Sequence, residues 1–149
     1  MVDGACGDDV TLVLVRMPEA PKATAVVDLP CKQRSVAVGR EFAVATVDTG
    51  DCPDAETRDT VELLTSELLT NAVRHGRGGA VTLRLLGFQD RVTVEVTDCS
   101  TREPRARRAG VEDESGRGLM LVEALAQAWG TRPSSGGKTV WCTVVPPHG

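Results

Sequence analysis

The run DAETRDTVELLTSELLTNAVRHG, residues 54–76, constrains the fold more than any other segment. Asp54 is a favourable helix N-cap residue, acidic residues fall in the first turns, and basic residues fall in the last turn. Gly76 follows as a helix stop. The segment therefore predicts a long helix over 54–75.

Two polar residues interrupt the apolar side of this helix. Leu64, Leu68, Asn71 and His75 are spaced by four, three and four residues, so the chain's only asparagine continues a leucine stripe. Glu67 lies four residues before Asn71 on the neighbouring edge of that stripe. Buried carboxamide and carboxylate groups are costly unless they are satisfied. They either bond to backbone and solvent at the rim of the core, or they line a site.

The remaining regular segments are shorter. We expect a strand at 23–30, an antiparallel hairpin formed by 80–87 and 91–98, and a last strand in GGKTVWCTVVP after an SSGG turn. Helices are expected near 32–48 and 118–129. The apolar side of the first of these should include Val38, Phe42, Ala45 and Val36. These elements predict an α+β fold, a two-layer sandwich whose mainly antiparallel sheet has helices on one face.

An acidic residue continues the inward face of the predicted hairpin. Val92, Val94 and Val96 share one face of the second strand, and Asp98 is the next member of that face. It stands at the strand's end, where an irregular loop begins. Such an aspartate is either a turn-forming or capping residue, or a ligand-binding group.

Residues 99–117 predict a long loop, and the stretch ESGRGL, 114–119, leads into the third helix. Gly116 and Gly118 have no side chains to block an anion at a helix start, where free amides favour phosphate. Such a pair of glycines also forms ordinary turns. It matches neither the dinucleotide-binding fingerprint nor the phosphate-binding loop of other nucleotide folds.

Composition narrows the class of protein. A net charge of −4 gives no global attraction to nucleic acid or to anionic membranes. Five scattered cysteines without a CxxC pair argue against a zinc site or a disulfide framework. The acidic start and the lack of a long apolar run indicate a cytoplasmic protein. We expect a partly mobile leader over 1–22 and one domain over 23–149.

The order of these features resembles the GHKL family of ATP-binding domains, which share the Bergerat fold. ELLTNAVRH, 67–75, looks like the family's N box; VTDCS, 96–100, stands where its first glycine box belongs; and SGRGLMLV, 115–122, looks like its second. The resemblance covers about residues 25–146 and is greatest to the small anti-sigma factor serine/threonine kinases of actinobacteria.

The resemblance implies roles for the polar residues. Asn71 would hold the Mg²⁺ that bridges the triphosphate of ATP, and Glu67 would orient or activate the attacking nucleophile. Asp98 would accept a hydrogen bond from the amino group of adenine. Thr139 matches a threonine that supports the adenine contact through water.

The glycine-rich stretch would serve the phosphates. Backbone amides at Gly116 and Gly118 would approach them, Leu119 would pack nearby, and 99–117 would form the ATP lid. Arg117, like Arg74, either neutralises phosphate charge or is a solvated arginine. His75 is better explained by the helix dipole than by catalysis.

Two functions follow from the resemblance. The first is a kinase that phosphorylates an anti-sigma antagonist and sequesters a sigma factor; pairing of two copies stays open. The second is a non-catalytic module that captures a protein partner, because the family's first box commonly reads DxGxG, whereas here Asp98 is followed by Cys99, Ser100 and Thr101. A sensor histidine kinase is a third option, disfavoured because the chain lacks room for the helical pair that carries a phospho-accepting histidine.

Overall fold

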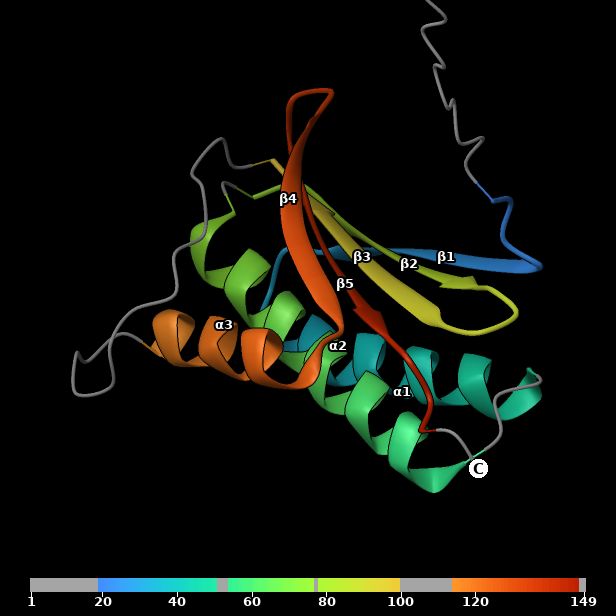
Figure 1. Cartoon of the computed structure of the whole chain (residues 1–149). Helices are drawn as coiled ribbons and strands as arrows, with labels where there is room; N and C mark the ends of the chain where they lie inside the picture. Colours follow the sequence, from blue (N-terminus) through green and yellow to red (C-terminus); the bar gives the residue numbers. More distant parts are fainter. Residues whose placement is uncertain (1–18, 51–53, 77, 100–113, 148–149) are drawn as a thin grey trace, which may run out of the picture.

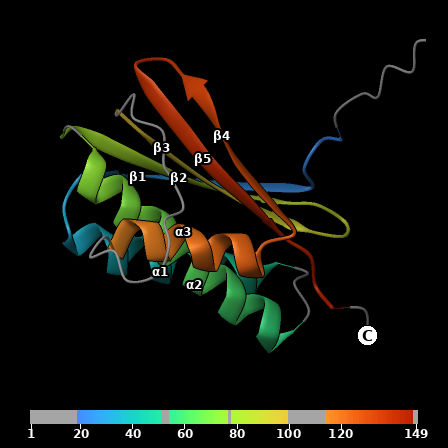
Figure 2. The same ribbon diagram turned by 60° about the vertical axis from the view of Figure 1, so that its left-hand side comes forward.

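The computed structural model describes residues 19–50, 54–76, 78–99 and 114–147. Its elements are β1(Ala23–Pro30), α1(Arg34–Thr49), α2(Ala55–His75), β2(Ala80–Gly87), β3(Val92–Asp98), α3(Glu114–Leu125), β4(Ala128–Ser134) and β5(Gly137–Val144). The strands form one sheet in the order β1-β2-β3-β5-β4, and every adjacent pair is antiparallel. The three helices lie together on one face of it (Figure 1 and Figure 2). The predicted α+β two-layer sandwich is confirmed.

The core lies between the helices and one face of the sheet. Alternate residues of the two central strands point into it, and their valines are almost completely buried, as at Val94, Val96, Val140 and Val144. The opposite face carries polar and charged side chains. On that face Glu95 Oε2 accepts a hydrogen bond from Arg132 at 2.7 Å, and Arg84 Nη1 lies 3.6 Å from Glu95 Oε1.

Helix α2 begins and ends as its sequence predicts. Asp54 caps it, because the Thr57 amide donates to Asp54 Oδ1 at 2.7 Å. At the other end the Gly76 amide donates to the Ala72 carbonyl. The leucine stripe is buried, with Leu64 and Leu68 inside the core cluster. This helix contacts α1, α3 and three strands, so it is the central element of the helical layer.

The predicted apolar face of α1 is partly wrong. Val38 is 52% exposed and Ala45 is also exposed, whereas Val36 is buried and Phe42 is half-buried. The buried stripe instead runs through small residues, because α1 packs closely on α2. A β-carbon placed on Gly39 would lie 2.3 Å from Leu69 Cδ1. Close helix contact therefore selects glycine where hydrophobicity alone would select a larger side chain.

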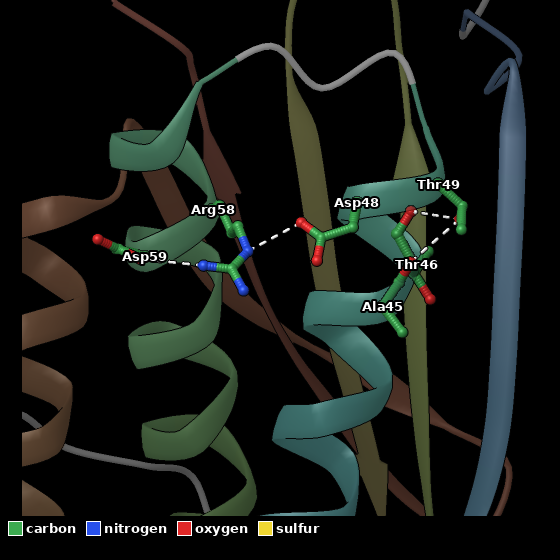
Figure 3. A network of polar contacts seen from close by, with 6 residues as sticks. All are labelled: Ala45, Thr46, Asp48, Thr49, Arg58 and Asp59. Atoms are coloured by element: carbon green, nitrogen blue, oxygen red, sulfur yellow. Dashed lines mark hydrogen bonds and ion pairs between the residues drawn. The ribbon is translucent and has the colours of Figure 1, made fainter.

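Polar contacts join α1 to the first turns of α2 (Figure 3). The Arg58 guanidinium donates to Asp48 Oδ1 at 2.8 Å, and its Nη1 lies 3.8 Å from Asp59. Thr49 Oγ1 donates to carbonyl oxygens of the preceding turn of α1. These side chains are largely exposed, so they orient the two helices without forming part of the core.

The C-terminal third contains a strand that the sequence reading missed. The helix expected over 118–129 is instead α3(Glu114–Leu125), and Ala128–Ser134 form β4, which pairs with β5. In the sequence, Trp129 and Gly130 look like the end of an apolar helix. Their conformation is instead determined by the pairing of β4 with β5 across the turn at Gly136, which has a φ of 77°. Pro133 is tolerated because β4 is an edge strand.

Parts of two predicted segments lie outside the described residues. These are most of the leader over 1–22 and most of the lid over 99–117. None of the helices that the structure describes is long and apolar enough to cross a membrane.

Candidate nucleotide site

Three elements that carry predicted site residues meet at one end of the sheet. They are the last turns of α2, the end of β3 and the start of β5 (Figure 1). Asp98 pairs in register with Lys138, and Cys99 Sγ lies 3.6 Å from where a β-carbon on Gly79 would stand. Because Gly79 follows α2 closely in the chain, these contacts place the end of α2 beside the end of β3.

Asn71 is buried on the core-facing side of α2. Its exposed fraction is 4%, and its Oδ1 makes no hydrogen bond to any residue that the structure describes. A buried carbonyl oxygen without a donor costs roughly 1–3 kcal/mol. Such a cost is common where a group serves a ligand instead of the fold. Of all the predicted site residues, Asn71 has the environment that is hardest to explain by packing.

Glu67 stands one helical turn before Asn71 and is half-buried. At the end of the same helix, Arg74 is exposed and His75 is half-buried. Both basic residues fall in the last turn, where they complement the helix dipole.

Asp98 faces the helices, as the alternation of β3 predicts, and its side chain is only 1% exposed. Beside it stands Lys138, whose side chain is 7% exposed and whose Nζ lies 3.9 Å from Asp98 Oδ2. Sequence reasoning missed Lys138. The signal was available, because Val140, Cys142 and Val144 form the inward face of β5 and Lys138 is the next member of that face.

Thr139 lies on the other face of the sheet. It pairs in register with Thr97, and the two hydroxyl oxygens are 2.6 Å apart. Adjacent residues of a strand point to opposite faces, so Thr139 and Asp98 do not lie side by side. Lys138, and not Thr139, is the residue of β5 that lies beside Asp98.

The second glycine box forms the start of α3. Gly116, Arg117 and Gly118 all belong to the helix, which begins four residues earlier than expected. Gly116 is the third residue of the helix, where amides have no partner within the helix, while the amides of Arg117 and Gly118 are placed for intrahelical bonds. Leu119 is 2% exposed and contributes to the core, and α3 packs on α2.

Gly137 fixes the start of β5 against the end of β3. A β-carbon on Gly137 would lie 1.8 Å from the carbonyl oxygen of Asp98 and 2.9 Å from Cys99 Cα. No side chain fits there without moving the backbone. Only glycine therefore allows the approach that sets Asp98 beside Lys138.

A cavity of about 460 Å³ lies elsewhere, between the start of β1, the end of α1 and the β2–β3 turn. Its walls include Thr24, Thr49, Phe88 and Val92. Val92 is six residues from Asp98 along β3, a distance of roughly 20 Å. None of the predicted site residues lines this cavity.

Comparison with known proteins shows the family of the chain. A family model described as a histidine kinase-like ATPase domain matches residues 29–144. The chain belongs to this family. The match spans all three described helices, the strands β2 to β5 and the last two residues of β1. The chain is also 41% identical to an uncharacterised protein of Streptomyces coelicolor over 81 residues, which make up 52% of this chain and 77% of the relative.

Membership of this ATPase family supports ATP as the ligand, and the residues present fit it. The buried oxygen of Asn71 is a suitable hard ligand for a magnesium ion, which retains water and phosphate oxygens in the rest of its shell. Asp98 supplies a hydrogen-bond acceptor, and the first turn of α3 supplies amide donors. These groups come from separate elements, as expected for a site built between a helical layer and a sheet.

Proposed function

We propose that this chain binds ATP with Mg²⁺ at the end of the sheet where α2, β3 and β5 meet, and that it is a serine/threonine protein kinase. The observation that carries the proposal is the buried Asn71 oxygen, which continues a leucine stripe and has no hydrogen-bond donor among the residues that the structure describes. Its burial costs free energy that a bound cation would offset. The family match supports ATP as the nucleotide.

The chemistry assigned to the chain is phosphoryl transfer to a hydroxyl group. The bond between the γ-phosphorus and the oxygen of ADP breaks, and a new bond forms to a serine or threonine oxygen of the substrate. Glu67 orients that hydroxyl and accepts its proton. Asp98 holds the adenine amino group, and amides at the start of α3, including that of Gly116, approach the phosphates. A bound Mg²⁺ would supply charge neutralisation on the triphosphate.

The substrate and the partner follow from the resemblance to anti-sigma factor kinases. The substrate is an anti-sigma antagonist protein, the sequestered partner is a sigma factor, and the compartment is the cytoplasm. Phosphorylation would then decide which of the two proteins the kinase holds. A pull-down from the native host, with and without nucleotide, would identify both.

Binding is tested by calorimetry with ATP and Mg²⁺. Asn71→Ala should abolish magnesium-dependent binding while the domain stays folded. Thr65→Val is a matched control, because Thr65 Oγ1 is also a buried oxygen of α2, has no hydrogen-bond partner in the part of the chain that the structure describes, and lies outside the proposed site. Equal affinities for Asn71→Ala and the parent would contradict the proposal.

Transfer is tested separately with radiolabelled ATP and a candidate antagonist. Glu67→Gln keeps the shape of the side chain, so it should retain ATP binding and lose about 100-fold or more in label transfer. A transfer rate equal to that of the parent would remove Glu67 from the mechanism.

A second function, the non-catalytic module, is favoured by one observation. The carboxylate proposed to hold adenine already has an ammonium group 3.9 Å away, and both side chains are buried. A stable complex with the antagonist, formed without label transfer, would support this module over the kinase.

A further inference from the structure

We propose that Lys138 limits the access of a nucleotide base to Asp98 and so sets the nucleotide affinity of the site. This inference rests on the proposed function, because it concerns the residue placed against the adenine. It assigns Lys138 a role in specificity and affinity, not in chemistry.

The geometry of the sheet places the two side chains together. Asp98 ends the inward face of β3, Lys138 begins the inward face of β5, and the two are partners in the antiparallel register. Their charged atoms are 3.9 Å apart, with side chains only 1% and 7% exposed. The carboxylate therefore lies covered at the position where an adenine amino group would have to reach it.

A hydrogen bond from adenine requires a nitrogen within about 3 Å of a carboxylate oxygen. Some of the atoms that cover Asp98 must then move. The backbone of Gly137 is held against the Asp98 carbonyl, with no room for even one added carbon. Lys138 has a flexible four-carbon stem, so its side chain is the part that can move with the least disruption of the sheet.

Replacing the Lys138 ammonium group by the amino group of adenine is unfavourable for the Asp98 carboxylate. An ammonium group forms a charge-assisted interaction, whereas the amino group of adenine is a neutral donor. Displacing the ammonium group of a buried ion pair removes charge compensation that a neutral donor replaces only in part. The base must therefore bind against the Asp98–Lys138 pair, which lowers the affinity of the native chain.

Substitution of Lys138 tests this directly. Lys138→Thr provides a short neutral donor suited to a strand and frees the space of the lysine stem. Lys138→Met keeps the apolar stem and removes only the charge, so it serves as the second variant if the threonine variant does not fold. Lys22→Thr is the matched control, because it removes one positive charge from an exposed site at the other end of the sheet.

The measurement is calorimetric titration of each folded variant with ATP and Mg²⁺ at one ionic strength. Lys138→Thr and Lys138→Met should each bind ATP at least about 10-fold more tightly than the parent, and Lys22→Thr should bind like the parent. The gain should vanish when Asp98→Asn is added to Lys138→Thr. Circular dichroism and thermal unfolding establish that each variant is folded.

The outcomes separate this inference from the proposed function. If the parent binds ATP and the Lys138 variants bind no more tightly, the inference fails and the proposed function stands. Weaker binding by these variants would make Lys138 a direct contact and also overturn the inference. Binding only by the variants would support the inference and identify the native chain as the non-catalytic module. Absence of binding in every protein would contradict both proposals.

Discussion

Gly137→Ala should be the most damaging small substitution at the candidate site. The added methyl carbon would stand 1.8 Å from the carbonyl oxygen of Asp98, and non-bonded contacts of a β-carbon are essentially never shorter than 3.0 Å. The nearest atoms belong to the backbone, so rotation of a side chain does not relieve the clash. The ends of β3 and β5 must separate.

The loss of stability in Gly137→Ala can be estimated from the interactions that are lost when the ends of β3 and β5 separate. Losing one or two ladder hydrogen bonds costs roughly 1 kcal/mol each, and overpacking at a tight contact typically adds about 1–3 kcal/mol. We therefore expect the free energy of unfolding to fall by about 2–5 kcal/mol. For a domain of this size, that corresponds to a decrease in Tm of roughly 6–15 °C.

Urea unfolding followed by tryptophan fluorescence measures this change, because Trp129 and Trp141 lie on the paired strands β4 and β5. Gly87→Ala is the matched control: it is also a strand glycine, but the nearest atom to its added carbon is 3.9 Å away. The control should stay within about 0.5 kcal/mol of the parent. Equal stability of the two variants would refute the claim that Gly137 permits the close approach of β3 and β5.

Two further predictions concern other parts of the fold. Arg58→Ala removes the exposed contact with Asp48 and should lower the free energy of unfolding by less than about 1 kcal/mol. This loss should be smaller at high salt. A loss above about 2 kcal/mol in urea unfolding would contradict the prediction. Burial raises the pKa of the Cys142 thiol from 9.0 to about 12. Because the folded-state pKa is the higher one, stability is fully present below pH 9 and is lost as the pH rises toward 12, by up to roughly 1.4 kcal/mol per pH unit. Cys142→Val should flatten this part of the stability curve, and an unchanged slope would show that other groups produce it.

Local signals predicted most of the fold correctly. The cap at Asp54, the stop at Gly76 and the alternation in β2 and β3 each depend on neighbouring residues, and the structure confirms these elements. The prediction failed where a distant contact decides the outcome. The face of α1 is set by Gly39 against α2, and β4 exists because it pairs with β5.

In the candidate site, too, local signals predict some features and contacts between distant residues decide the others. The inward position of Asp98 follows from alternation along one strand, and the burial of Asn71 follows from helical spacing. The partner of Asp98 depends on the register between β3 and β5, which joins residues 40 positions apart in the chain. Alternation applied to β5 places Lys138 inward, but only the register places it beside Asp98.

The strand order has a consequence for how a ligand enters. β3 is the middle strand, with neighbours on both sides, so its amides should exchange with solvent deuterium only when the whole sheet opens. β1 and β4 are at the edges and should exchange sooner. If Lys138 limits access to Asp98 as proposed above, rotation of its side chain would admit a base while the strands stay paired.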